Sequence, residues 1–148
     1  MFKHSFALFA FAAASPLAAQ DLSTAQPVAG SWTYAMTGGG TEARFADTAG
    51  NPQLWVQCTR ATRRVSLARP ATAAAPFLTV WTSSLTRNVP ASFNPATRRL
   101  TIDLATYDPL LDAIVSSRGR VGYTIGAQPS FVVPPWPEVA RVIEDCRA

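Results

Sequence analysis

The chain has 148 residues, of which 48% are hydrophobic and 15% are charged, and its formal net charge is +4. Its one histidine, His4, and its one lysine, Lys3, both lie within the first 19 residues. Serine and cysteine nucleophiles need a histidine or lysine base, and Schiff-base chemistry needs a lysine. Removal of those 19 residues would therefore exclude these mechanisms.

The first 19 residues have the three-part layout of a secretory signal peptide. Two basic residues precede an apolar run over 6–14, and small residues follow up to Ala19. The run is broken by a serine and a proline well before the roughly 20 apolar residues that a membrane-spanning helix needs. We predict cleavage near Ala19, a periplasmic or secreted protein, and one β-rich domain over 20–148 with no transmembrane segment. A buried N-terminal helix is the alternative.

Most of residues 20–148 alternate between apolar and polar side chains, the pattern of strands with one buried face. The first two expected strands form a hairpin around Gly38, Gly39 and Gly40. Residues 77–82 are apolar or β-branched at every position, which predicts a central strand covered on both faces. The expected strands cover 32–36, 43–45, 54–58, 65–67, 77–82, 100–104, 121–125 and 131–133.

Two segments have helical signals instead. Asp108 can act as an N-cap, Pro109 suits the first helical position, and Gly119 can end the helix. Pro137 begins a second helix, whose apolar residues fall on one face as far as Cys146. These elements predict an α+β fold that is mainly antiparallel β. We expect a sandwich or small barrel of about seven to eight strands, with two short helices in the C-terminal half and one disulfide.

The two cysteines of an exported chain predict one disulfide, between Cys58 and Cys146. Both lie on apolar faces, Cys58 with Leu54 and Val56, and Cys146 with the apolar residues of the last helix. A reactive thiol is the alternative, but it needs a nearby base or cation, and residues 20–148 contain no histidine or lysine.

Metal and cofactor chemistry has little support in the sequence. We find no zinc or copper ligand set, calcium loop, phosphate-binding glycine loop or dinucleotide fingerprint, and we predict no cofactor and no metal site. The mechanism that survives these exclusions is a pair of carboxylates, as in glycoside hydrolysis. The candidates are Asp108 with Asp112, and Glu144 with Asp145. Each also has a plain structural interpretation, as an N-cap or as an exposed acid, so we predict no catalytic residue.

Arginine supplies every basic side chain after residue 19, in groups at 60–64, 98–99 and 118–120. With neighbouring tryptophans these groups could imitate a groove for single-stranded nucleic acid, but export argues against that partner. For an exported basic surface we predict an envelope protein, a glycan or an anionic lipid as the partner, and no nucleic acid. The sequence leaves the oligomeric state open.

Two segments, the turn at 118–120 and the proline-rich segment around Trp136, together suggest a recognition surface. Arg118 and Arg120 flank a turn, and Trp136 lies among prolines that stiffen the chain. Rigid aromatic and arginine side chains dominate binding energy at interfaces, so we predict a partner-binding surface at these three residues. In the alternative interpretation, Trp136 fills the end of the core and the arginines pair with Asp112, Glu144 or Asp145.

Residues 108–120 (DPLLDAIVSSRGR) and 134–147 (PPWPEVARVIEDCR) together resemble a group of small exported proteins of alphaproteobacteria, of the sphingomonad type. The resemblance implies an exported bacterial protein with Cys58 bonded to Cys146, and no activity. The placement of the cysteines also resembles that of periplasmic inhibitors of c-type lysozyme, which are small β-barrels. Residues 116–123 are the only counterpart of their inhibitory loop, and such barrels lack the two helices expected here.

Three functions follow as hypotheses. The first is a noncatalytic exported binding or accessory protein. The second is an inhibitor of a cell-wall hydrolase. The third is a carboxylate-dependent hydrolase.

Overall fold

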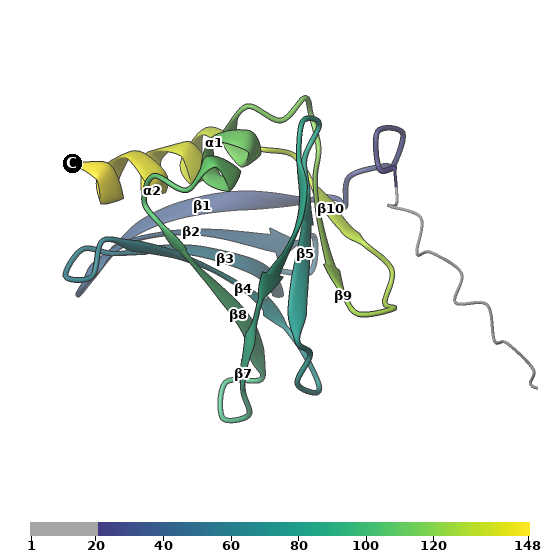
Figure 1. The fold of residues 1–148 in the computed structure, drawn as a ribbon, viewed down its shortest axis with the longest axis horizontal. Coiled ribbons are helices and arrows are strands. Elements are labelled where there is room, and N and C mark those ends of the chain that lie inside the picture. The colour runs from purple at the N-terminus through teal and green to yellow at the C-terminus, as the bar shows by residue number, and fades with distance from the viewer. Residues whose placement is uncertain (1–20) are drawn as a thin grey trace, which may run out of the picture.

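The computed structural model describes residues 21–148, so the predicted signal peptide lies outside the described residues. This part of the chain forms ten strands and two helices (Figure 1). The strands are β1 Gly30–Thr37, β2 Gly40–Asp47, β3 Pro52–Thr59, β4 Arg64–Pro70, β5 Phe77–Trp81, β6 Thr86–Pro90, β7 Ser92–Asn94, β8 Arg99–Ala105, β9 Val121–Ile125 and β10 Phe131–Val133. The helices are α1 Pro109–Val115 and α2 Pro137–Arg147.

The strands form two antiparallel sheets, one in the order β1-β2-β3-β4-β8-β7 and the other in the order β10-β9-β5-β6. Only Ala91 separates β6 from β7, so the chain passes almost directly from one sheet to the other. At the opposite edge, the N–H of Val28 donates to the carbonyl of Val132 at 2.8 Å, which joins the approach to β1 with β10. The two sheets therefore meet at both sides. The expected mainly antiparallel α+β fold is confirmed.

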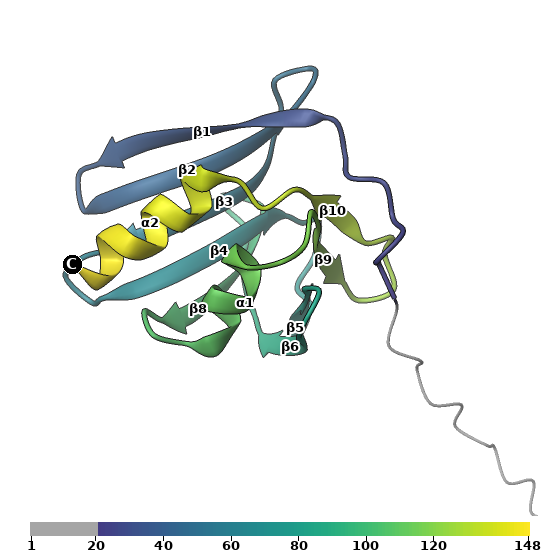
Figure 2. The same ribbon diagram turned by 90° about the horizontal axis from the view of Figure 1, so that it is seen from above.

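The core lies between the two sheets and beneath the helices. α2 packs against β1, β2, β3 and β4, and Figure 2 shows it lying along the face of the larger sheet. Its apolar face is buried as the spacing predicted, at Val139, Val142, Ile143 and Cys146. α1 buries Leu110, Leu111 and Ile114. The alternating positions of β3 and β4 complete this core, including Leu54, Val56, Val65 and Leu67.

Two strands were missed and one prediction was wrong. The extra strands are β6, whose polar residues and final proline hide its pattern, and the three-residue β7. β5 has neighbours on both sides within its sheet, but only one of its faces is covered. Leu78 and Val80 are fully buried while Phe77 is 45% exposed. Thr79 and Trp81, on the same face of the strand as Phe77, are partly exposed, because no second layer packs fully over that face.

α1 ends earlier than the position of Gly119 suggested. Its last residue is Val115, and Ser116 is the C-cap residue, whose N–H and hydroxyl both donate to the carbonyl of Asp112. The N–H of the next residue, Ser117, donates to the carbonyl of Ile114 in a tighter turn instead of continuing the helix. Gly119 instead forms the following turn with a φ of +72°. Asp108 is the N-cap, as predicted, and accepts the N–H of Leu110 at 2.8 Å.

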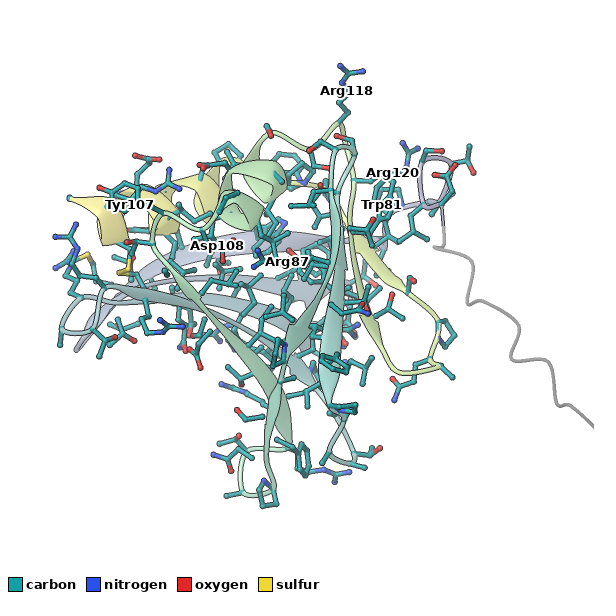
Figure 3. The ribbon with its side chains drawn as sticks, in the orientation of Figure 1. Trp81, Arg87, Tyr107, Asp108, Arg118 and Arg120 are labelled. Atoms are coloured by element: carbon teal, nitrogen blue, oxygen red, sulfur yellow. A yellow bond between two sulfur atoms is a disulfide. The ribbon has the colours of Figure 1, made fainter. Side chains whose placement is uncertain are left out.

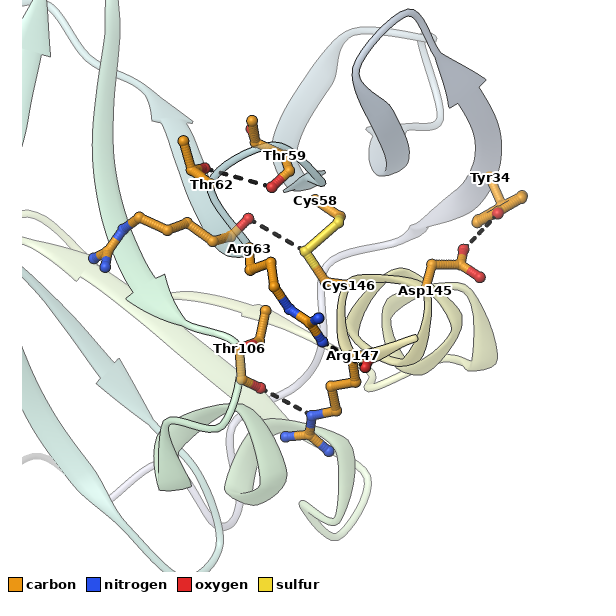
Figure 4. The surroundings of a disulfide bond; sticks show 10 residues. Tyr34, Cys58, Thr59, Thr62, Arg63, Thr106, Asp145, Cys146 and Arg147 are labelled. Carbon is orange, nitrogen blue, oxygen red and sulfur yellow. Dashed lines mark hydrogen bonds between the residues drawn. A yellow bond between two sulfur atoms is a disulfide. The ribbon is translucent and has the colours of Figure 1, made fainter.

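The disulfide between Cys58 and Cys146 is confirmed. It joins β3 to α2, with the two Cα atoms 5.4 Å apart (Figure 4). Both residues are buried, so the bond lies inside the contact between sheet and helix. Its closed loop spans 88 residues.

A short segment before β1 is also part of the packed structure, which the sequence did not indicate. Leu22 is 5% exposed and lies on Gly122 of β9. A Cβ atom on Gly122 would lie 2.2 Å from Cδ1 of Leu22, so the absence of a side chain at Gly122 creates the space that Leu22 fills.

Candidate binding surfaces

The turn between α1 and β9 is held firmly against the turn between β5 and β6. The hydroxyl of Ser83 accepts the N–H of Arg118, and the hydroxyl of Ser117 accepts the N–H of Ser83, both at 3.0 Å. The hydroxyl of Ser117 also donates to the carbonyl of Arg120. These bonds cross between two loops, so the turn presents its side chains from a fixed backbone.

The two arginines of this turn differ in their surroundings. Arg118 is exposed, and Figure 3 shows its side chain pointing away from the body of the protein. Within residues 21–148 its guanidinium makes no hydrogen bond or ion pair. The Nε of Arg120 donates to the carbonyl of Ala25, so that side chain holds the segment before β1.

The acids that could have paired with these arginines have other partners. Arg147 bonds Asp112 at 2.8 Å and Glu144 at 3.3 Å. Asp145 accepts the hydroxyl of Tyr34 at 2.6 Å. The interpretation in which Arg118 and Arg120 pair with these acids is therefore wrong, because the C-terminal arginine and a tyrosine occupy the carboxylates.

Trp136 is the N-cap residue of α2 and is 52% exposed. The interpretation in which it fills the end of the core is wrong. Trp32 of β1, which is partly buried, packs against the core instead, edge-on to Phe45 with ring centroids 5.5 Å apart. The indole N–H of Trp32 donates to the carbonyl of Pro134 at 3.1 Å, which fixes the proline-rich approach to Trp136.

A groove of about 440 Å³ lies between β1 and the first turns of α2. The guanidinium of Arg141 lies over the ring of Tyr34, 4.0 Å from the ring centre. The bond from Tyr34 to Asp145 raises the pKa of the tyrosine, because that bond favours the neutral phenol. The groove is lined by Trp32, Thr33, Tyr34, Pro137, Glu138 and Arg141.

Glu138 gives this groove an unsatisfied polar atom. Its Oε2 is buried and has no hydrogen-bond partner within the described part of the chain. A buried carboxylate oxygen without a donor is costly, and such an atom in a native structure calls for an explanation. The groove therefore combines two aromatic rings with one cation and one carboxylate that lacks a donor. No local pattern in the sequence marks this groove, because its two groups of residues, 32–34 and 137–141, are about a hundred positions apart.

A second concavity, of about 410 Å³, lies between residues 72–75 and 125–128. Gln128 is its largest polar side chain, and alanines, one glycine, Thr72 and Ile125 form the rest of its lining. Its lining contains no charged side chain.

The four carboxylates considered for catalysis have structural partners. Asp108 caps α1 and accepts Arg87 at 2.9 Å. Burial raises its pKa, but the bonds from Arg87 and Leu110 outweigh burial, and the pKa of Asp108 is lowered overall. Asp112, Glu144 and Asp145 bond to Arg147 or Tyr34, as described above. None of the four lines either concavity.

Other arginines lie against backbone carbonyls or aromatic rings. Arg99 covers the ring of Trp55, 3.7 Å from its centre, which leaves that tryptophan only 7% exposed. Trp55 therefore offers no face on which a nucleotide base could stack. Arg63 donates to the carbonyl of Arg147 at 2.7 Å, and Arg64 to that of Asp103 at 3.0 Å.

Arg69, which is partly buried, is held in a similar way. Its guanidinium lies 3.9 Å from the ring centre of Phe131, and its Nε donates to the carbonyl of Gln53 at 3.1 Å. Burial lowers the pKa of Arg69 to about 10, so it remains charged near neutral pH.

Two features are absent from residues 21–148. No three or more histidine, cysteine or acidic side chains within that range are placed to hold a metal ion together. No helix within it is both long and apolar enough to cross a membrane.

No family model matches this chain, and it matches no curated protein and no solved structure. The resemblances to exported proteins of alphaproteobacteria and to lysozyme inhibitors therefore stay predictions, and the function has to be argued from the surfaces themselves.

Proposed function

We propose that this chain is a noncatalytic exported protein that binds a partner in the cell envelope. The observation that carries the proposal is the half-exposed Trp136, which is held in a rigid frame although the core does not need it. Tryptophan is among the residues most enriched at binding hot spots. The next residue, Pro137, lines the groove between β1 and α2, so Trp136 stands beside a concave surface.

Arg118 supports the same proposal from a second element. Its backbone is fixed by Ser83, while its guanidinium has no partner among residues 21–148. A rigid backbone lowers the entropy cost of binding, and a free guanidinium can form bidentate bonds with carboxylate or phosphate. We therefore keep an acidic envelope protein, an anionic glycan and an anionic lipid as the partner classes.

The disulfide supports the exported part of the proposal. The only two cysteines are bonded to each other, and such bonds persist in oxidising compartments such as the periplasm. N-terminal sequencing and intact mass of the protein recovered after expression in a bacterial host test this part. We expect a protein that begins near residue 20. An uncleaved chain recovered from the cytoplasm would contradict export.

Capture experiments with defined probes test the binding part. The immobilised protein is exposed separately to envelope protein extract, isolated peptidoglycan and vesicles of anionic phospholipid. We expect reproducible binding to one probe, and loss of that binding in Trp136→Ala and Arg118→Ala. Phe77→Ala and Arg60→Ala are matched controls, since each removes an exposed residue of similar type elsewhere. Absence of binding to all three probes would contradict the proposal.

Inhibition of a cell-wall hydrolase is the second candidate function. It is favoured by the projection of Arg118 from a fixed turn within residues 116–123, because a glycosidase active site contains paired carboxylates that attract a cation. A c-type lysozyme assay tests it directly. Protection of cell walls at micromolar protein, lost in Arg118→Ala, is the expected result, and full lysozyme activity would remove this candidate.

A further inference from the structure

β1 is a long edge strand without the usual protection. It has eight residues, Gly-Ser-Trp-Thr-Tyr-Ala-Met-Thr, and none is charged or proline. Six of them are exposed and the other two are partly exposed. Edge strands usually carry charges, prolines or bulges that prevent pairing with another chain. A long, uncharged edge therefore indicates a place where a further strand can add.

The other sheet edges of residues 21–148 are short or protected. β10 has three residues, and Val28 already bonds to it. β7 also has three residues, and β6 has five, which include Arg87 and Pro90. β1 is thus the one edge in the described chain that offers a long open ladder.

The register with β2 shows which backbone groups are free. Thr37 pairs with Gly40 across a two-residue turn, and such closing pairs are hydrogen-bonded to each other. By alternation, the backbone groups of Thr33 and Ala35 also point to β2. Those of Trp32, Tyr34 and Met36 point to the open edge. The N–H of Val28 follows the same alternation and bonds to Val132 on that side.

We propose that β1 pairs with β1 of a second copy of this chain, antiparallel and around a twofold axis at Thr33. In this register Trp32 forms hydrogen bonds with Tyr34 of the second copy, and Thr33 lies opposite Thr33. The larger sheets of the two copies become one continuous sheet. The two grooves beside β1 meet across the axis and become one.

Charge complementarity favours a second copy over an unrelated peptide. Glu138 and Arg141 lie about one helical turn apart on the part of α2 that lines the groove. Across the twofold axis the two copies of α2 run in opposite directions. Arg141 of each copy therefore lies at about the same position along the joined sheet as Glu138 of the other copy. A strand without charges also brings no like charges together at the axis.

The oligomeric state tests this inference. Sedimentation velocity of the disulfide-bonded protein, from micromolar to submillimolar concentration, should show a concentration-dependent dimer. Thr33 is exposed, so Thr33→Lys is compatible with the fold, and it places two lysines opposite each other at the axis. We expect it to raise the dimer dissociation constant several-fold, up to about fivefold for one pair of like charges directly opposite each other.

Thr33→Glu should weaken the dimer in the same way, and an equal mixture of the two variants should dimerise again. Ala35→Lys is the control on the same face of the strand, because in this register it faces Ser31 rather than itself.

Arg141→Glu should weaken the dimer, and the swap Arg141→Glu with Glu138→Arg should restore it. A protein that stays monomeric at all concentrations, or a Thr33→Lys dimer of unchanged stability, would overturn the proposal. Arg118→Ala should leave the dimer unchanged, because Arg118 does not lie on β1. The dimer can therefore be refuted without refuting the proposed binding function.

Discussion

Asp108 at the start of α1 and Arg87 on β6 are bonded at 2.9 Å, so one carboxylate joins the cap of a helix to an edge strand of the smaller sheet. The side chain of Asp108 is only 19% exposed, which reduces the screening of the pair by water. An aspartate considered for catalysis from its position in the sequence thus has two structural bonds.

Asp108→Ala should lower the free energy of unfolding by about 1 to 2 kcal/mol, mostly through loss of the helix cap. Chemical denaturation at neutral pH measures this change. Asp112→Ala is the control, because Asp112 is 64% exposed and its bond to Arg147 should contribute less. Equal losses of unfolding free energy in the two variants would contradict the assignment of Asp108 as the cap of α1.

The same residue predicts part of the acid sensitivity. The pKa of Asp108 is lower in the folded protein than in the unfolded chain, so its contribution to stability is complete above the unfolded pKa. That contribution is lost as pH falls through the folded pKa. Wild type should therefore lose more stability between neutral and strongly acidic pH than Asp108→Asn does. Parallel curves of unfolding free energy against pH would contradict this.

The bond between Cys58 and Cys146 should stabilise the fold by up to about 4 to 5 kcal/mol, the chain-entropy value for a loop of this length. We expect the double variant Cys58→Ala, Cys146→Ala to lose several kcal/mol in denaturant unfolding. Amide exchange should increase first in α2, because the bond holds that helix to β3. Unchanged exchange in α2 would show that helix packing alone is sufficient. Two titratable thiols in the native wild-type protein would contradict the bond itself.

Trp32 and Trp136 should differ in their effect on stability. Trp32→Ala removes a packed ring and the bond to Pro134, so we expect a loss of about 3 kcal/mol or more. Trp136→Ala removes a ring that is half exposed, and a loss of less than about 1 kcal/mol is expected. Thermal unfolding of both variants checks this contrast. A large loss of stability in Trp136→Ala would show that Trp136 has a structural role.

Leu22 should contribute although it lies close to the predicted cleavage site. Leu22→Ala is expected to cost about 2 kcal/mol, since the side chain is buried on β9. Gly122→Ala should displace the same side chain and make the segment before β1 more sensitive to limited proteolysis. Ser23→Ala is the exposed neighbour that controls for position. Proteolysis unchanged by Gly122→Ala would show that Leu22 does not anchor this segment.

Local pattern predicted much of this fold. The alternation in 54–58 and 100–104, the Asp108 cap and the apolar face ending at Cys146 depend on neighbours in the sequence, and all are confirmed. β6 was missed because its pairing with β5 does not require an apolar face. The exposure of Phe77 could not be predicted, because it depends on the absence of a covering layer.

The candidate site depended on contacts between distant residues. Three of these contacts join residues that are about a hundred positions apart in the sequence: Tyr34 with Asp145, Trp32 with Pro134, and Arg120 with Ala25. The sequence placed Trp32 in a strand and Trp136 in a proline-rich segment, but it did not show that Trp32 packs edge-on against Phe45. The groove between β1 and α2 had no local signature for the same reason.

The most direct test of the proposed binding function is to measure capture and melting temperature on the same samples of wild type, Trp136→Ala and Arg118→Ala. The account predicts that both variants keep the wild-type melting temperature to within a few degrees while capture of the envelope probe is lost. Capture at the wild-type level in both variants, or a loss of capture that only follows unfolding, would contradict it.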